Sequence, residues 1–208
     1  SIDGEGKRQG FLTTFLRLHD CNIRCSYCDT LYSYGPESTF ESMSVQAVAD
    51  AIEQLENHRI TVTGGEPLLQ ELAIIELIDE LTRRNARYDF NIETNGTIIP
   101  SFHRDNVWFT YDYKTPSSLA EDAMNLDIFK VATPADIIKF VVGSMQDLDR
   151  MDEILKTYPT DAQIFVSPVW GNIEGATIIE YMKAHNWQNV RFQLQIHKFI
   201  WDPDAKGV

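Results

Sequence analysis

The sequence has few cations, few cysteines and no long apolar run. Lys and Arg number 18 against 31 Asp and Glu, which gives a formal net charge of −13 at pH 7. This excess of carboxylates leaves no broad basic face to neutralise phosphates, so a nucleic-acid partner is disfavoured. Apolar runs such as 73–75 and 140–142 are bounded by charge, whereas a bilayer span needs about 20 consecutive apolar residues. We therefore expect a soluble protein with no nucleic-acid or membrane partner.

Length and composition favour one folded unit. The chain has 208 residues, of which 43% are hydrophobic and 24% charged, and a chain of this kind can bury a full core. No segment has the composition of a linker, a low-complexity tract or a repeat, so we expect a single domain over residues 1–208. The first residue is Ser1 rather than Met. We expect the sequence to begin inside the native chain, so that an N-terminal address would not be visible.

Short β-rich runs alternate with helical patterns along the chain. The predicted strands cover 11–18, 59–63, 88–93, 107–111, 137–142, 163–166 and 190–196, and the predicted helices cover 45–56, 70–84, 145–157 and 173–185. In the second helix, Leu72, Ile75, Ile78 and Leu81 recur at helical spacing. The alternation predicts right-handed crossovers. We expect an α/β fold, an incomplete TIM-like barrel of about six mostly parallel strands, with function at their C-terminal ends.

The three cysteines are Cys21, Cys25 and Cys28, within eight residues. An odd, clustered set cannot form a disulfide framework, so it indicates a metal or redox site in a reducing compartment such as the cytoplasm. Structural zinc usually takes four ligands, and with His19 as a conceivable fourth it stays an alternative. Three thiolates can instead hold three irons of a cubane and leave the fourth iron open to a substrate or cofactor.

A second candidate motif, Gly64-Gly65-Glu66-Pro67, follows the predicted strand 59–63. Glycines let the backbone approach a ligand closely, and the Glu66 carboxylate can accept a hydrogen bond from an ammonium group. An ordinary strand-to-helix turn with proline at the helix start is the alternative.

The cysteine spacing, with Tyr27 directly before the last cysteine, resembles that of radical S-adenosylmethionine (SAM) enzymes. This resemblance implies a 4Fe-4S cluster on Cys21, Cys25 and Cys28, with SAM chelating the remaining iron. It also implies that Gly64, Gly65 and Glu66 bind SAM. One electron from the reduced cluster would split SAM, and the resulting radical would take a hydrogen atom from the substrate. An electron donor such as flavodoxin or ferredoxin is implied as a partner.

A more specific resemblance covers nearly the whole chain. The segments 1–6, 15–18, 28–30, 92–96, 112–118, 167–170 and 195–201 are similar to those of the 7-carboxy-7-deazaguanine synthase family of queuosine biosynthesis. The resemblance implies a carbon–nitrogen lyase that converts 6-carboxy-5,6,7,8-tetrahydropterin into 7-carboxy-7-deazaguanine with loss of ammonia. The cluster, SAM and Mg²⁺ would be required. A homodimer is also implied.

The same resemblance implies roles for individual residues. The Arg17 guanidinium suits a substrate carboxylate, and Glu5 can accept from the 2-aminopyrimidinone edge of a pterin. Thr30 would bind Mg²⁺ through its hydroxyl. The other implied substrate contacts are Ile2, Asp3, Gly4, Thr63 and Val208, and the other implied cofactor contacts are Asp112, Tyr113, Lys114, Ser167, Pro168, Val169 and Trp170.

Several alternatives stay open at this point. The segments 112–114 and 167–170 depart from the commoner Ser-Pro-Lys and Gln-Pro patterns, so buried strand ends are the competing explanation for both. A glycyl-radical activating enzyme shares the cysteine spacing but acts on a protein backbone. A zinc-stabilised binding module or a simple electron-transfer iron–sulfur protein is the alternative from another class.

Overall fold

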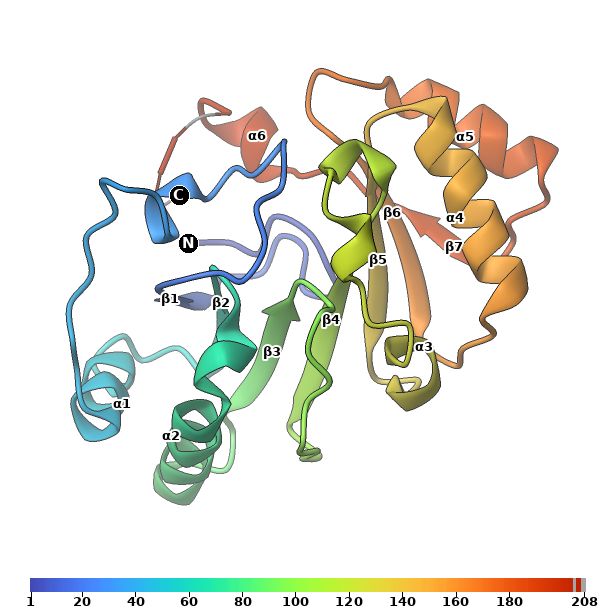
Figure 1. Ribbon diagram of the computed structural model, residues 1–208. Coiled ribbons are helices and arrows are strands. Elements are labelled where there is room, and N and C mark those ends of the chain that lie inside the picture. The colour runs from blue at the N-terminus through green and yellow to red at the C-terminus, as the bar shows by residue number, and fades with distance from the viewer. Residues whose placement is uncertain (204, 207–208) are drawn as a thin grey trace.

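The computed structural model describes residues 1–203 and 205–206, and one parallel sheet organises them (Figure 1). Its strands are β1 (Thr14–Leu18), β2 (Arg59–Gly64), β3 (Asp89–Thr94), β4 (Val107–Lys114), β5 (Ile137–Val142), β6 (Gln163–Pro168) and β7 (Val190–Phe192). They follow one another in the sheet in sequence order, and every neighbouring pair is parallel. Because each right-handed crossover adds a strand at the same edge, the connecting helices fall on one face.

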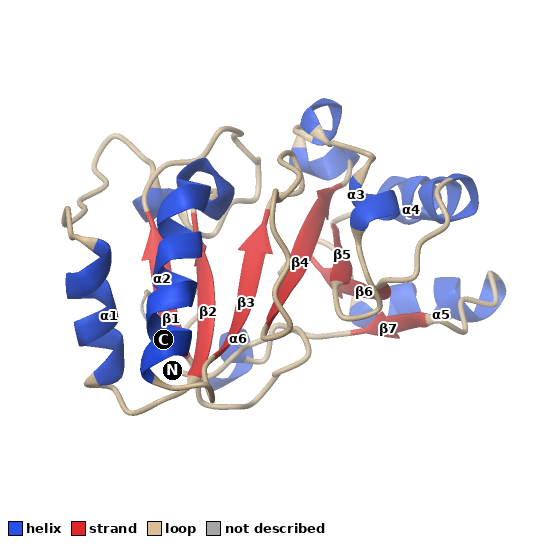
Figure 2. Ribbon diagram, turned by 90° about the horizontal axis from the view of Figure 1, so that it is seen from below, coloured by secondary structure: helices blue, strands red, loops and turns tan. Residues whose placement is uncertain are grey.

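The helices that connect successive strands accordingly cover one side of the sheet. They are α1 (Val45–Glu53), α2 (Glu71–Arg84), α3 (Ile128–Val131), α4 (Met145–Thr157) and α5 (Gly175–Ala184). A further short helix, α6 (His197–Ile200), follows the last strand. In Figure 2, α1 and α2 lie in front of the first strands, whereas α6 lies behind the sheet. The fold is therefore an open α/β barrel, as predicted, with seven strands instead of about six and with parallel pairing throughout. Every helix in the described part of the chain is too short or too polar to span a bilayer.

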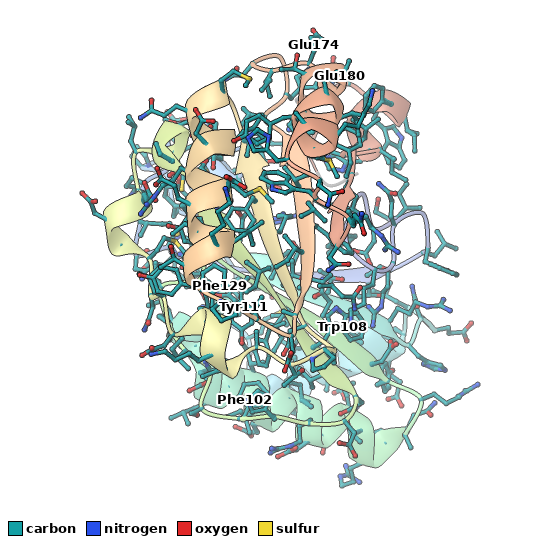
Figure 3. The ribbon with its side chains drawn as sticks, turned by 90° about the vertical axis from the view of Figure 1, so that its right-hand side faces the viewer. Phe102, Trp108, Tyr111, Phe129, Glu174 and Glu180 are labelled. Atoms are coloured by element: carbon teal, nitrogen blue, oxygen red, sulfur yellow. The ribbon has the colours of Figure 1, made fainter. Side chains whose placement is uncertain are left out.

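The face of the sheet beneath the helices is apolar and forms the core. Figure 3 shows Tyr111 and Phe129 on this side and Trp108 on the opposite side of the sheet. Helix α2 packs onto it through the buried residues Ile74, Leu77, Ile78 and Leu81. The predicted helical stripe differs at Leu72, which is 81% exposed. Leu72 precedes Ile74 by two residues, about 200° around the helix, so it points to solvent.

The opposite, inner face of the sheet is polar. Residues in register on parallel strands project to the same side. The inner-face pairs are Arg17 with Thr63, Thr61 with Asn91, Glu93 with Thr110, and Asp112 with Lys139. Several of these polar side chains are nevertheless buried, among them Thr61, Asn91, Thr110 and Lys139. A polar but enclosed sheet face is the lining expected of a binding cavity.

The two ends of the chain meet where the barrel is open. The Gln193 side chain, just after β7, accepts from the Gly6 N–H at 2.8 Å and donates to the Gly6 carbonyl at 2.9 Å. The Ile196 N–H donates to the Gly4 carbonyl at 3.0 Å. These bonds join the segment before β1 to the segment after β7, so the N-terminal loop is fixed over the sheet.

This closure explains where the predicted strands are too long. The first strand starts at Thr14 instead of residue 11 because Leu12 bridges Ile2 in antiparallel fashion. The last strand ends at Phe192 instead of residue 196 because Gln193 turns toward the N-terminal loop. The predicted helix 45–56 ends at Glu53, and the predicted helix 173–185 covers Gly175–Ala184. The other strands and helices agree with prediction to within three residues at each end.

Candidate active site

The cysteine loop crosses the C-terminal end of the barrel. It starts after β1, where Asp20 adopts a positive φ of 80°, and it is anchored beyond β4. There the Ser26 N–H donates to the Ser118 carbonyl at 2.9 Å, and the Ser26 hydroxyl donates to the Ser117 carbonyl at 2.5 Å. The thiols of Cys21, Cys25 and Cys28 are partly buried and form no disulfide. The three thiols therefore lie over the ends of strands that carry the polar face.

Burial disfavours the thiolate form of Cys25, whereas Lys114 and Asn95 are groups that can stabilise thiolate ligands of a cluster. Burial raises the pKa of Cys25 to about 11, and the nearby Lys114 ammonium opposes this rise. The Asn95 side-chain amide lies 3.7 Å from Cys21 Sγ, so it can donate to a thiolate. Among the residues described, no three His, Cys, Asp or Glu side chains converge on one metal ion. A cubane takes one thiolate per iron, so its ligands need not converge on one point.

The two glycines of the second motif allow close packing against the start of the cysteine loop. A Cβ on Gly64 would lie 2.1 Å from the Leu18 carbonyl oxygen, and a Cβ on Gly65 would lie 1.7 Å from the Asp20 carbonyl oxygen. The Gly65 N–H donates to the Leu18 carbonyl at 3.0 Å. The sequence predicts that these glycines bring the backbone close to a ligand. In the structure they bring the end of β2 against the residues that lead into Cys21.

Glu66 is fully buried and bonded within the protein. Its carboxylate accepts from the Leu68 N–H at 2.9 Å, the Thr94 hydroxyl at 2.8 Å and the Asn95 N–H at 2.7 Å. Burial raises the pKa of Glu66, and these donors oppose the rise. In the structure this carboxylate is bonded to protein donors, and a contact of Glu66 with SAM stays a prediction. The carboxylate joins the ends of β2 and β3 and holds Asn95 beside Cys21.

A row of charges crosses the inner face from the N-terminal loop toward the cysteines. Lys139 Nζ lies 2.8 Å from Glu5 Oε1 and 3.5 Å from Asp112 Oδ2, and Lys114 Nζ lies 2.9 Å from the same Asp112 oxygen. Among the described residues, Glu5 Oε2, Asp112 Oδ1 and Ser167 Oγ are buried polar atoms without a hydrogen-bond partner. Buried polar atoms are normally paired. Unpartnered atoms on this face fit a site that is completed by a ligand.

Strand alternation separates Tyr113 from its neighbours. Asp112 and Lys114 project to the inner face, whereas the Tyr113 ring is buried on the helix side against Phe140, with centroids 5.0 Å apart. Its hydroxyl donates to Glu121 Oε1 at 2.9 Å. The Tyr113 side chain therefore points away from the inner face, because a strand cannot present three consecutive side chains to one face, and a cofactor contact of Tyr113 stays a prediction.

The end of β6 contributes one inward polar group. Ser167 is in register with Val141 and faces the interior, and Pro168 ends the strand. The Val169 side chain is buried, and the exposed Trp170 packs edge-on against Phe199 of α6 at 5.0 Å. Ser167 is thus the side chain of this segment that faces the inner face, and cofactor contacts of residues 167–170 stay a prediction.

The N-terminal loop lies over the inner face of the sheet, and its residues make different contacts. The buried Asp3 carboxylate accepts from Thr13 Oγ1 at 2.8 Å and from Thr61 Oγ1 at 3.2 Å. A Cβ on Gly4 would lie 1.8 Å from His197 Nδ1, so the loop packs directly on α6. Asp3 and Ile2 hold the loop together, and a substrate contact of either residue stays a prediction. Glu5 reaches the inner face.

Arg17 and Thr63 are neighbours in register on β1 and β2. The Arg17 guanidinium is exposed and lies 5.5 Å from the centre of the Tyr32 ring. The Thr63 hydroxyl donates to Glu93 Oε2 at 3.0 Å. Burial and the nearby Glu5 and Asp3 raise the pKa of Glu93 to about 7, and Lys139 opposes this rise.

The last two predicted contacts are Thr30 and Val208. The Thr30 hydroxyl donates to Asp29 Oδ1 at 3.1 Å and lies 3.9 Å from Cys28 Sγ, so a hydroxyl and a carboxylate meet beside the last cysteine. These oxygens are ligands that Mg²⁺ accepts. Val208 lies outside the described residues.

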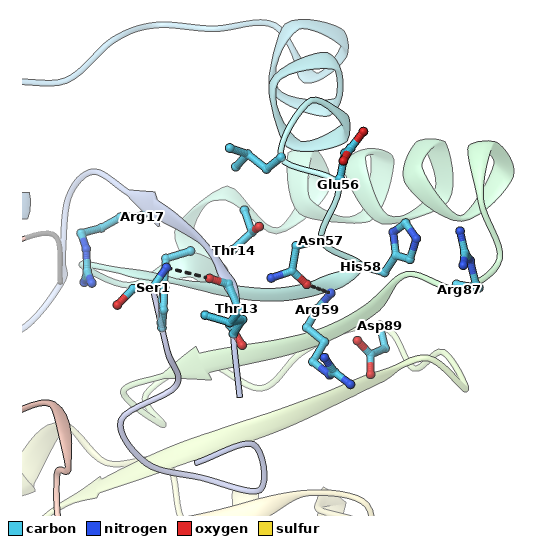
Figure 4. Close-up of a pocket in the computed structure, with 13 residues that line it drawn as sticks. Ser1, Thr13, Thr14, Arg17, Glu56, Asn57, His58, Arg59, Arg87 and Asp89 are labelled. Carbon is cyan, nitrogen blue, oxygen red and sulfur yellow. Dashed lines mark hydrogen bonds between the residues drawn. The ribbon is translucent and has the colours of Figure 1, made fainter. Parts of the chain in front are cut away.

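A wide groove lies mostly away from the cysteines, although Arg17 lines one end of it. It has a volume of about 930 Å³ and runs along β1 from Arg17 to His58, Arg87 and Asp89 (Figure 4). His58, Arg87 and Asp89 lie around the N-terminal ends of β2 and β3, and none of the cysteines lines the groove. The polar groups that surround the thiols lie at the opposite, C-terminal ends of the strands.

Sequence reasoning misses three residues of the inner face: Lys139, Glu93 and Asn95. Lys139 is the lone charge in the otherwise apolar strand Ile137–Val142. A buried lysine is rare unless it is paired, so this position carries a signal. Glu93 and Asn95 belong to the segment 92–96, which the sequence marks only as a family match.

Comparison with known proteins shows the family of the chain. The model of the Radical SAM superfamily matches residues 17–156, so the chain is a radical SAM protein, a class that implies a 4Fe-4S cluster and SAM. It is 37% identical to the 7-carboxy-7-deazaguanine synthase of Clostridium acetobutylicum over 100% of this chain and 96% of the relative. It is also 37% identical to that of Methanospirillum hungatei, over 98% of this chain and 83% of the relative.

The chain therefore belongs to the 7-carboxy-7-deazaguanine synthase family. Among solved structures, native anSMEcpe with bound AdoMet overlaps 88% of this chain and 52% of that chain, with 15% identity and a TM-score of 0.45. That likeness is too low to bear on the site, which is argued from the residues above.

Proposed function

We propose that this chain converts 6-carboxy-5,6,7,8-tetrahydropterin into 7-carboxy-7-deazaguanine with loss of ammonia. The family supports the reaction. The structural observation that supports the reaction in this molecule is the row of charges Glu5, Lys139, Asp112 and Lys114. This row links the N-terminal loop to the surroundings of Cys25 across one polar face. Substrate and cofactor can then lie side by side on that face.

Each group on this face has a distinct task in the proposal. Glu5 Oε2 accepts from the amino-pyrimidinone edge of the pterin, and Arg17 binds a substrate carboxylate. Thr63, whose hydroxyl donates to Glu93, lies beside Arg17 on the sheet. Asp112, Lys114 and Ser167 bind the polar parts of SAM together with the backbone of Gly64 and Gly65. When bound, the cluster and SAM supply a one-electron route to hydrogen-atom abstraction.

Further parts of the proposal rest on chemistry and family alone. Mg²⁺ is held at Thr30, whose hydroxyl lies beside Asp29, with substrate oxygens and water in the rest of its shell. The enzyme works in the cytoplasm as a homodimer and takes its electrons from a flavodoxin or ferredoxin. Neither a glycyl-radical activating enzyme nor a zinc-stabilised binding module is favoured by the comparisons.

An anaerobic assay tests the proposal. The reconstituted protein is mixed with the carboxypterin, SAM, Mg²⁺ and a reductant, and the products are identified by mass spectrometry. We expect 7-carboxy-7-deazaguanine together with 5′-deoxyadenosine. Cys25→Ala should yield neither, because it removes one of three cluster thiolates. Cleavage of SAM by the wild type with no change to the pterin would refute the proposed substrate.

A further inference from the structure

Within the part of the chain that the structure describes, one side chain bonds to the Glu5 carboxylate. Its Oε1 accepts from Lys139 Nζ at 2.8 Å, and its Oε2 is buried and has no hydrogen-bond partner there. Both side chains are largely enclosed, with 8% of Lys139 and 14% of Glu5 exposed. A carboxylate anchored through one oxygen keeps the other oxygen at a defined place, available to a ligand.

The backbone around Glu5 is fixed independently of this ion pair. Gly4 is bonded to Ile196, and both backbone groups of Gly6 are bonded to the Gln193 side chain. Only the Glu5 side chain is therefore left to be positioned, and Lys139 reaches it from β5 on the opposite side of the barrel interior.

Asp112 does not replace Glu5 as the main partner of Lys139. Asp112 Oδ2 is closer to Lys114, at 2.9 Å, than to Lys139, at 3.5 Å. Each ammonium thus has its own nearest carboxylate: Lys114 pairs with Asp112 near the cysteines, and Lys139 pairs with Glu5 near the N-terminal loop. This division separates a cofactor half of the charge row from a substrate half.

We propose that Lys139 is a positioning residue that anchors Glu5 Oε1 and aims Glu5 Oε2 at the amino-bearing edge of the pterin. The inference rests on the proposed function. Lys139 does not touch the substrate. It sets specificity for a 2-amino group, because a fixed carboxylate oxygen rejects a ligand that offers no N–H at that place.

Ligand binding to the cluster-loaded enzyme under anaerobic conditions tests this role without turnover. The probes are 6-carboxypterin and its 2-desamino analogue, and the readout is the ratio of their dissociation constants. We expect wild type to prefer 6-carboxypterin about tenfold or more, the range for a charge-assisted hydrogen bond. In Lys139→Met the ratio should fall toward one, and Lys139→Arg should restore part of it.

A double mutant separates this role from a structural one. If Lys139 acts through Glu5, Lys139→Met should weaken 6-carboxypterin binding in wild type but not in the Glu5→Gln background. Lys130→Met is the matched control, because Lys130 pairs with Asp127 on the surface at 75% exposure. Losses that simply add, or an unchanged probe ratio in a folded Lys139→Met protein, would overturn the inference. Failure of wild type to bind 6-carboxypterin or form product would instead refute the proposed function.

Discussion

Asn95 connects Glu66 to the first cysteine. Its backbone N–H donates to Glu66 Oε2 at 2.7 Å, and its side-chain amide lies 3.7 Å from Cys21 Sγ. The Glu66 carboxylate thus fixes the position of Asn95, and Asn95 in turn contacts a predicted ligand of the cluster, Cys21.

Glu66→Ala should be strongly destabilising. The change leaves three buried donors, on Leu68, Thr94 and Asn95, without their acceptor. A buried unsatisfied donor costs about 1–3 kcal/mol, so we expect a loss of at least ~3 kcal/mol in urea unfolding. Glu76→Ala, at an exposed position of the following helix α2, should change stability by about 0.5 kcal/mol or less. A Glu66→Ala protein that is as stable as wild type but binds SAM poorly would instead support a direct contact between Glu66 and SAM.

Gly65→Ala should block cluster assembly. The added Cβ would lie 1.7 Å from the Asp20 carbonyl oxygen, and a backbone atom cannot yield as a flexible side chain can. We expect iron content after reconstitution to fall well below the roughly four irons of a cubane. Gly143→Ala is the control, since its Cβ would meet no atom closer than 3.4 Å. Equal iron content in the two variants would show that the close approach does not matter.

Arg17→Ala should uncouple the reaction. The side chain is exposed and its guanidinium lies over the Tyr32 ring, so folding should change little while the substrate carboxylate loses its partner. We expect 5′-deoxyadenosine to form with product reduced at least about tenfold, as for the loss of a charge-assisted bond. Arg59→Ala, which removes a guanidinium near Phe11, should remain coupled. If SAM cleavage and product formation stay coupled in Arg17→Ala, then Arg17 does not bind the substrate carboxylate.

Glu93 should make stability depend on pH in a defined direction. Its pKa is raised from 4.5 to about 7, chiefly by burial. Between these values the folded state binds the extra proton, so this group's contribution is present below pH 4.5 and is lost as pH rises toward 7. Glu93→Gln should therefore gain stability relative to wild type over this range, by up to ~1.4 kcal/mol per pH unit. Urea unfolding at about pH 5, 6 and 7, which spans the window between the two pKa values, measures this difference. A constant difference would contradict the assignment.

The sequence is informative about the elements and less so about side-chain direction. Periodicity and turn residues locate the strands because each is an apolar run between polar turns. The family match assigns residues 112–114 to the site together, although alternation sends Tyr113 into the helix layer. Strand periodicity alone is enough to separate them.

Contacts between distant segments are beyond the reach of sequence reasoning. The pairing of Gln193 with Gly6 spans 187 residues, and that of Lys139 with Glu5 spans 134. No local pattern encodes either contact, because both join the N-terminal loop to residues far along the chain that the barrel brings beside it. The bonds of Glu66 to Thr94 and Asn95, at the end of the next strand, likewise cannot be foreseen from the motif alone.

In the proposed reaction, the polar inner face holds C6 of the pterin beside the group that abstracts hydrogen. Substrate deuterated at C6 tests this placement directly when the label is followed by mass spectrometry. We expect 5′-deoxyadenosine to gain deuterium in step with formation of 7-carboxy-7-deazaguanine. Product formed together with unlabelled 5′-deoxyadenosine would contradict it.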